Sequence, residues 1–461
     1  MLIPIGRFLS LIAFLTIGFS FSASAAEERP LPSVVSEFKG IKNFLFDDPI
    51  SKPFLMPSRP QYTDAPAMSR HSDISTVQED GKNLNACLET LPYDHHSMIE
   101  RVGQAARVMV NHTAAPIEQF TIQPFFSGLK GPKLTLMRRD LERALVYHQG
   151  SANEIYHNSV ITSDPRAILC RTKDRFQWDA EIRTHIDVFE SNHAPLYRSD
   201  LILNGRIHLT RHFMGSLGLR NRLHDNLIDD PNLRILDRFD PIRQDVFGYA
   251  QNRQGIDHAM ISGFATPAPD FYIAGHGGFL EEMFFGLGGE VLYRPYDSVL
   301  AIGAEAWATT KRIPFDGAWN TLDNGNRQTS ALLNLWYDMP RYPLQFGASY
   351  GQFLDGDVGG QFKARYTPAP GWQIEGFATL TNQDDRTLDN NDDTKLFAGL
   401  KLTMPLGNLA ALPDNSRMSV DFKPFARDKG QRIETPYSLY DLTDPWHTNT
   451  IYRYWDDLTT E

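Results

Sequence analysis

The feature that most constrains this fold is a series of segments, each roughly ten residues long, in which apolar and polar side chains alternate. The pattern is clearest at Met283–Arg294, where Leu287 and Val291 fall on one side and Glu290 on the other. Successive side chains of a β-strand point to opposite faces, so each segment predicts a strand with one apolar face and one charged face. The pattern recurs at 300–307, 331–337, 344–350, 361–366, 372–380 and 395–402.

The links between these segments differ in length. Two are long and rich in Asn or Asp (312–327 and 383–394), whereas the proline-containing turns are short: 266–270, 295–297, 340–343 and 367–371. Transmembrane barrels have short turns on one side and longer loops on the other. Residues 173–461 therefore predict a transmembrane antiparallel β-barrel of about 12 strands, because bacterial barrels usually have an even number. A soluble antiparallel sandwich is the alternative that alternation alone would allow.

The N-terminal part predicts export from the cytoplasm. Residues 1–26 resemble a cleaved signal peptide, with Arg7, an apolar run over 8–21 and small residues after it. No cysteine lies near the cleavage site, so we expect no lipid anchor. Residues 27–85, rich in Pro, Ser and Asp, predict an extended or loosely ordered arm.

Residues 86–172 predict a small α+β domain. We expect a helix over 97–110 and a strand over 117–126. A second helix is expected from the spacing of Leu134, Met137, Leu141 and Leu145.

Cysteine content and charge narrow the partners. An oxidising compartment would permit a disulfide between Cys87 and Cys170, and two buried thiols are the alternative. The net charge of -11 argues against nucleic acid as a partner.

Alternation also predicts which side chains would line the barrel interior. Two interpretations of this set remain open: a polar path that contacts a sugar polymer, or a salt-bridged interior that stiffens a closed barrel. The predicted lumen-facing residues are Glu290, Glu305, Trp307, Trp336, Lys363, Arg365, Glu375 and Lys401.

Three stretches resemble the YjbH family of exopolysaccharide biosynthesis proteins, which includes the GfcD proteins of group 4 capsule: Gly278–Pro295 (GFLEEMFFGLGGEVLYRP), Arg138–Asn158 and Pro241–Val246. The resemblance spans about residues 115–445. It implies an outer-membrane barrel that works with capsule or exopolysaccharide machinery and with periplasmic or lipoprotein partners. We therefore expect a protein of the outer membrane, with the α+β domain in the periplasm. It would contact lipid and surface polysaccharide, and bind or guide polymer without enzymatic chemistry and without a cofactor.

Other motifs suggest different activities. Ser349 lies in a Gly-x-Ser-x-Gly match, which would suit a lipid or glycan hydrolase, but the serine falls inside a predicted strand rather than on a strand–helix turn. A general porin is a further alternative. His95 and His96 lack a third ligand at metal spacing, and the acidic stretch 384–393 lacks the order of a calcium loop, so no metal site is expected.

Overall fold

The computed structural model describes residues 63–64, 68, 74–163, 168, 170–188, 195–227, 241–313, 322–386, 393–407, 409, 411–425 and 427–460. Within these, 322–326, 385–386 and 393–394 are described for their backbone alone. The expected signal peptide and most of the expected arm lie outside the described residues.

The N-terminal α+β domain contains a six-stranded sheet in the order β1-β2-β3-β5-β6, with β4 paired to β3. Its strands are β1 (Ile74–Asp80), β2 (Asn83–Glu89), β3 (Gln119–Phe126), β4 (Leu129–Lys130), β5 (Lys133–Met137) and β6 (Val160–Thr162). The sheet therefore begins inside the stretch expected to be an arm, and the expected boundary at residue 86 falls within β2.

Helix α4 (Met98–His112) connects β2 to β3, and these two strands are parallel because the helix carries the chain back along the sheet. Its first turn is capped by Ser97, whose hydroxyl accepts a hydrogen bond from the Glu100 N–H at 3.0 Å. The apolar side of α4 is buried, including Ile99, Val102 and Met109.

The second predicted helix is only partly correct. Leu134 lies in β5 and pairs with Ile122 of β3, because these residues complete the sheet rather than extend the helix. Helical structure starts at α5 (Arg138–Leu141), continues through η1 (Glu142–Val146) and resumes at α6 (Ala152–Asn158).

A disulfide joins Cys87 of β2 to Cys170. Both sulfur-bearing side chains are buried with Phe125 and Ile168 in a small apolar cluster. The bond therefore ties the link that leads into the barrel to the middle of the sheet.

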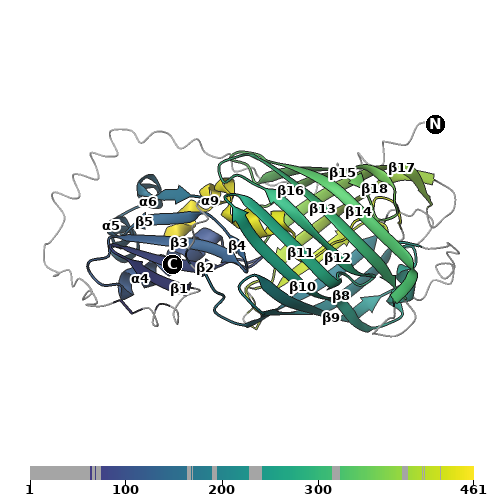
Figure 1. Ribbon diagram of the computed structural model, residues 1–461, viewed down its shortest axis with the longest axis horizontal. Coiled ribbons are helices and arrows are strands. Elements are labelled where there is room, and N and C mark those ends of the chain that lie inside the picture. Colours follow the sequence, from purple (N-terminus) through teal and green to yellow (C-terminus); the bar gives the residue numbers. More distant parts are fainter. Residues whose placement is uncertain are drawn as a thin grey trace. The chain divides into compact units, whose positions relative to one another are not determined.

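The C-terminal part is a closed barrel of thirteen strands (Figure 1). Neighbours are antiparallel except the closing pair, β19 and β7, which is parallel. The barrel of about 12 strands expected from the sequence is confirmed, and the exact number is 13: in an up-and-down chain, an odd last strand points the same way as the first and closes on it in parallel. The strands are β7 (Phe176–Asp187), β8 (Leu196–His208), β9 (Phe213–Asp225), β10 (Gln254–Ala268), β11 (Phe271–Phe279), β12 (Phe284–Tyr293), β13 (Leu300–Arg312), β14 (Leu322–Asp338), β15 (Leu344–Gln352), β16 (Val358–Tyr366), β17 (Gln373–Arg386), β18 (Asp393–Pro405) and β19 (Arg417–Phe422).

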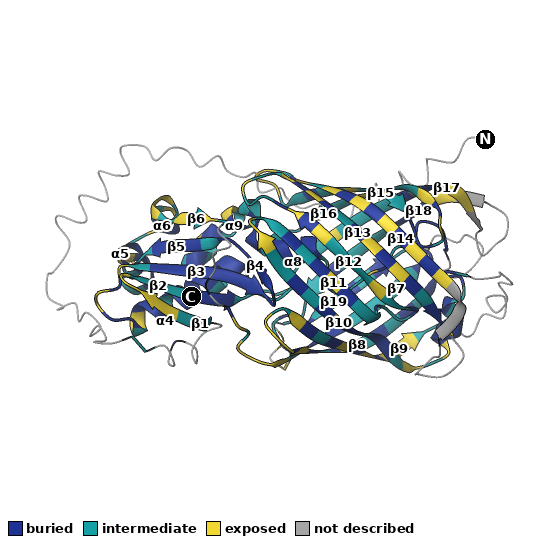
Figure 2. Cartoon of the chain, viewed as in Figure 1, coloured by how far each residue is buried: buried dark blue, intermediate teal, exposed yellow. Residues whose placement is uncertain are grey.

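The barrel's outer face is apolar and exposed, and its inner face is buried. Leu287, Leu333 and Tyr350 are 67%, 66% and 65% exposed, whereas Glu305 and Asn334 on the opposite face are buried. Figure 2 shows the alternation as exposed and buried bands along β13 and β14. Closure excludes the open sandwich alternative. Among the described residues, no helix combines the length and the apolar character needed to cross a bilayer.

The barrel has a domain end, where the chain enters from the α+β domain, and a far end. Phe126 of the domain contacts Phe264 of β10, and the Lys130 N–H donates to Thr266 Oγ1 at 3.0 Å. The four short proline-containing turns lie at this domain end, since each connects a strand that runs towards the domain to one that leaves it.

The chain does not end as a barrel strand. After β19, residues 423–425 and 427–460, here called the C-terminal segment, turn back through the lumen and leave at the domain end. The segment contains α8 (Leu439–Thr443), η3 (Asp444–Trp446), α9 (Thr448–Arg453) and η4 (Trp455–Thr459). Trp455 Nε1 donates to the Ala152 carbonyl at 2.7 Å, so the segment is docked on the α+β domain. Within residues 173–461, the part expected to form the barrel, the last barrel strand is therefore β19.

Candidate functional site

The lumen is divided into two small cavities, of about 200 and 210 Å³. Gln431, Glu434 and Thr435 of the C-terminal segment line both, so this segment forms the partition. Tyr93, from the loop after β2, also lines both cavities, with the Arg417 guanidinium stacked over its ring at 4.4 Å. The barrel interior is therefore filled rather than open.

A pair of carboxylates marks the first cavity. Glu290 of β12 and Glu305 of β13 are directly opposite in the strand register, and like charges in such a position repel. The C-terminal segment offsets this repulsion: Arg432 Nη2 donates to Glu305 Oε2 at 2.6 Å, and the Leu439 N–H donates to Glu290 Oε2 at 3.0 Å.

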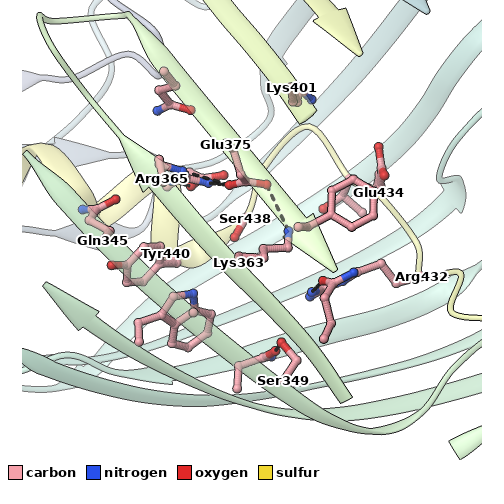
Figure 3. Close-up of a pocket in the computed structure, with 18 of the residues that line it drawn as sticks. Gln345, Ser349, Lys363, Arg365, Glu375, Lys401, Arg432, Glu434, Ser438 and Tyr440 are labelled. Carbon is pink, nitrogen blue, oxygen red and sulfur yellow. Dashed lines mark hydrogen bonds and ion pairs between the residues drawn. The ribbon is translucent and has the colours of Figure 1, made fainter. Parts of the chain in front are cut away.

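A charged cluster lies on the neighbouring strands (Figure 3). Arg365 of β16 donates to Glu375 of β17 through Nε at 3.0 Å and Nη2 at 2.7 Å. Lys363 Nζ reaches the other oxygen of Glu375 at 3.3 Å. Arg365 Nη1 also donates to Asp441 of the C-terminal segment at 2.5 Å, so the cluster holds both the wall and the segment.

The two predicted lumen tryptophans pack close to glycines of the barrel wall. Trp336 lies against Gly303 and Gly347 and stacks on Tyr440 of the C-terminal segment, with ring centroids 4.6 Å apart and planes inclined by 8°. A side chain at Gly288 would collide with Trp307, whose ring is 5.8 Å from that of His276. Aromatic residues pack here where glycines leave room.

Seven of the eight predicted lumen residues line the first cavity: Glu290, Glu305, Trp336, Lys363, Arg365, Glu375 and Lys401. The eighth, Trp307, is 4% exposed and is buried beside the acid pair. Lys401 Nζ lies 4.0 Å from Asp421 Oδ1. Four of the eight residues, Glu290, Glu305, Arg365 and Trp336, contact the C-terminal segment directly.

Sequence reasoning missed the second cavity. Its wall carries ion pairs: Arg183 Nη1 of β7 lies 2.8 Å from Asp257 Oδ1 of β10, and Arg220 Nη2 of β9 lies 2.6 Å from Glu282 Oε1 in the link between β11 and β12. Glu181 accepts from Arg183 at 3.1 Å. The available signal was charge at every second position of the strand that begins at residue 176.

Ser349 lacks the surroundings of a hydrolytic nucleophile. It lies inside β15, and its hydroxyl donates to Asn334 Oδ1 at 2.6 Å. His276 Nδ1 is engaged with Ser262 Oγ at 2.9 Å. Among the described residues, no histidine or carboxylate forms a hydrogen bond with Ser349.

His95, His96 and the acidic stretch 384–393 are the other residues that the sequence analysis considered as metal ligands. His96 Nδ1 is 2.6 Å from Glu100 Oε1, and His95 Nδ1 is 3.2 Å from the Asp414 carbonyl oxygen. No group of three or more His, Cys, Asp or Glu residues suited to a metal occurs among the described residues. Residues 387–392 of the acidic stretch lie outside that part of the chain.

One buried carboxyl group lies at the junction between domain and barrel. Glu89, at the end of β2, accepts from Gln177 Nε2 at 3.1 Å and lies 3.7 Å from His208 Nε2. Burial raises the pKa of Glu89 to about 7, although the Gln177 hydrogen bond and Arg206 oppose the shift. The junction therefore contains a group that titrates near neutral pH.

Two comparisons with known proteins show what this chain is similar to. A family model described as "Exopolysaccharide biosynthesis protein YbjH" matches residues 60–445. The chain is also 26% identical over 427 residues to the "Uncharacterized lipoprotein YjbH" of Escherichia coli strain K12, an alignment that covers 85% of this chain. The chain spans 59% of the length of that relative.

Proposed function

Because the chain belongs to the YjbH family of exopolysaccharide biosynthesis proteins, we propose that it is an accessory outer-membrane barrel that binds or guides a surface polysaccharide during export. It performs no covalent chemistry. The observation that carries the proposal is a closed barrel whose outer face is exposed and apolar while its inner face is polar and enclosed.

The exposed apolar face supports the location. Monomeric soluble proteins rarely expose contiguous apolar surfaces this extensive, whereas a lipid-facing band requires them. The domain end, with its short turns, would face the periplasm, where oxidising conditions suit the Cys87–Cys170 disulfide. The α+β domain would then meet periplasmic or lipoprotein components of the export machinery.

The interior supports the polymer role over the alternatives. A general porin needs an open aqueous channel, and here the C-terminal segment fills the lumen. A hydrolase would need a base beside Ser349, and its hydroxyl is bound to an amide oxygen instead. Aromatic, amide and charged groups on one enclosed face suit contact with sugar hydroxyls and rings.

Location is tested by membrane fractionation together with heat-modifiable gel migration. We expect outer-membrane recovery and a folded band that shifts on boiling. Recovery in the soluble periplasm would overturn the proposal.

The role is tested in a deletion strain complemented with the wild-type chain or with Ser349→Ala. We expect deletion to reduce surface polysaccharide and both chains to restore it. Unchanged polysaccharide in the deletion strain would contradict an export role. Failure of well-folded Ser349→Ala alone to restore it would favour the hydrolase.

A further inference from the structure

The inner face of β12–β18 that lines the first cavity, here called the wall face, is already occupied by the chain itself. We propose that residues 429–441, here called the plug, occupy a saccharide-binding face of the barrel and leave it when polymer binds. This inference rests on the proposed function for the identity of the polymer, but displacement of the plug can be tested without any polysaccharide.

The plug supplies the wall face with the contacts that a sugar chain would supply. Tyr440 covers the free side of Trp336, where a sugar ring would stack. Arg432 and the Leu439 N–H donate to the Glu305 and Glu290 carboxylates, as hydroxyl groups would. A polymer and the plug therefore compete for one set of groups.

Two acceptors remain unused even with the plug in place. Glu305 Oε1 and Gln345 Oε1 are buried and have no hydrogen-bond partner among the described residues. Both side chains line the first cavity. A buried acceptor without a donor is costly, so a donor-rich ligand is favoured at this place.

The charge of the groups around the first cavity indicates the class of ligand. Without the plug, the cavity is lined by four acidic residues (Glu290, Glu305, Glu375 and Asp421) and four basic ones (Lys363, Arg365, Lys401 and Lys423). Four minus four leaves no net charge. A neutral, hydroxyl-rich polysaccharide segment therefore fits this face better than a strongly charged one.

The plug can move without dismantling the barrel, because none of its residues belongs to a barrel strand. At the far end, Lys429 Nζ lies 2.5 Å from Asp355 Oδ2 and the Gly430 N–H donates to Asp357 Oδ2 at 2.9 Å. At the domain end, Arg294 Nη2 donates to Asp444 Oδ1 at 2.9 Å. The cavities on either side have room for water but not for a polymer, so passage requires displacement of the plug.

The first experiment measures ion conductance of the purified full-length chain in planar lipid bilayers. The plug is loosened by the double substitution Arg432→Ala with Asp441→Ala, which leaves every wall residue intact. The matched control is Arg183→Ala with Asp257→Ala. It also removes one arginine and one aspartate, but these two residues pair with each other between barrel strands β7 and β10. We expect several-fold higher conductance for the loosened variant than for wild type or control.

If the loosened variant and the control conduct equally and both migrate as folded barrels, the proposal that residues 429–441 form a displaceable plug is wrong. If the double variant does not fold, Tyr440→Ala takes its place in the same assay; it removes the stack on Trp336, the hydroxyl's hydrogen bond to Asp338 and the ring under the Arg294 guanidinium. Because neither native cysteine is free, Ser349→Cys adds a single thiol inside the first cavity. We expect bulky thiol reagents to label it faster in the loosened background, and unchanged labelling would count against displacement.

The ligand class is tested with the loosened variant and two probes, neutral dextran oligosaccharides and anionic oligogalacturonides. We expect the neutral probe to reduce the current and the anionic probe to reduce it less. A current blocked by the anionic probe alone, or by neither, would overturn the neutral saccharide face. If loosening the plug raises the conductance in bilayers but deletion leaves surface polysaccharide unchanged, the displaceable plug is confirmed and the proposed export function is wrong.

Discussion

Replacement of Arg432 by methionine tests how the C-terminal segment stabilises the folded barrel. Arg432 connects two groups of the wall: its Nη2 donates to Glu305 Oε2 at 2.6 Å and its Nη1 donates to Gln361 Oε1 at 3.1 Å. Methionine keeps most of the length of the side chain and removes the charge. The Glu305 carboxylate then faces Glu290 across the strand pair without its cation.

The magnitude follows from burial. Removal of one partner from a fully buried ion pair costs about 3–5 kcal/mol, because the other charge stays buried. The Arg432 and Glu305 side chains are 18% and 7% exposed, and the pair borders a cavity with room for water. Partial solvation reduces the cost, so we expect a loss of about 2–3 kcal/mol in the free energy of unfolding.

The assay is reversible urea unfolding in lipid vesicles, followed by tryptophan fluorescence, for a double-mutant cycle of Arg432→Met and Glu305→Gln. Because the substituted glutamine side chain carries no charge, the double variant should recover to within about 1 kcal/mol of wild type. A loss below about 0.5 kcal/mol for Arg432→Met, as for an exposed ion pair, would refute the reasoning, as would failure of Glu305→Gln to restore stability.

Three further predictions concern the junction, the disulfide and the outer face. Since burial raises the pKa of Glu89 above its unfolded value, the folded chain should lose stability as pH rises from about 4.5 to about 7, by an amount on the order of 3 kcal/mol; urea titrations should show that Glu89→Gln abolishes this loss, and an unchanged pH profile would count against it. Replacement of Cys87 and Cys170 by alanine opens a link spanning 83 residues and should cost about 4–5 kcal/mol by loop entropy, measured by urea unfolding of the full chain; equal stability of the two proteins would be incompatible with that estimate. Leu333→Arg, on the exposed face of β14, should destabilise the vesicle-inserted barrel by about 2–4 kcal/mol, whereas Leu409→Arg, outside the strands, should cost much less; equal effects would mean that Leu333 does not face lipid.

Alternation predicted the two faces of the barrel because side-chain direction in a strand depends only on position along it. Leu287 and Leu333 are exposed, and Glu290 and Lys363 line the lumen cavity, as the period of two requires. This part of the prediction needed no knowledge of how the strands pair.

The contents of the lumen were not predictable in the same way. Residues 423–438 contain two prolines and no sustained period, so no local pattern predicts where they lie. Their place inside the barrel depends on long-range contacts such as Arg432 with Glu305, which no local pattern encodes. The exact number of strands could not be predicted for a related reason, since a strand that closes in parallel has the same sequence pattern as one that closes antiparallel.

The helix expected around Leu134 was partly wrong because tertiary pairing overrode the local spacing. Leu134 and Leu136 lie two positions apart on β5, so they share one face of the strand, and both are buried. β5 pairs with β3 on one side and β6 on the other. The spacing of Leu134 with Leu141 would also satisfy a helical stripe, so the sequence pattern alone did not separate the two structures.

The most direct test of a lipid-embedded barrel is a spin-label scan of residues 331–335 of β14 in lipid bilayers, with relaxation by oxygen and by a water-soluble nickel complex at each position. We expect labels at Ala331, Leu333 and Leu335 to collide with oxygen dissolved in lipid, and labels at Leu332 and Asn334 to be shielded from both reagents by the plugged lumen. If Leu333 and Leu335 instead collide mainly with the water-soluble complex, the barrel is not embedded in lipid and the proposed role in export across the outer membrane is wrong.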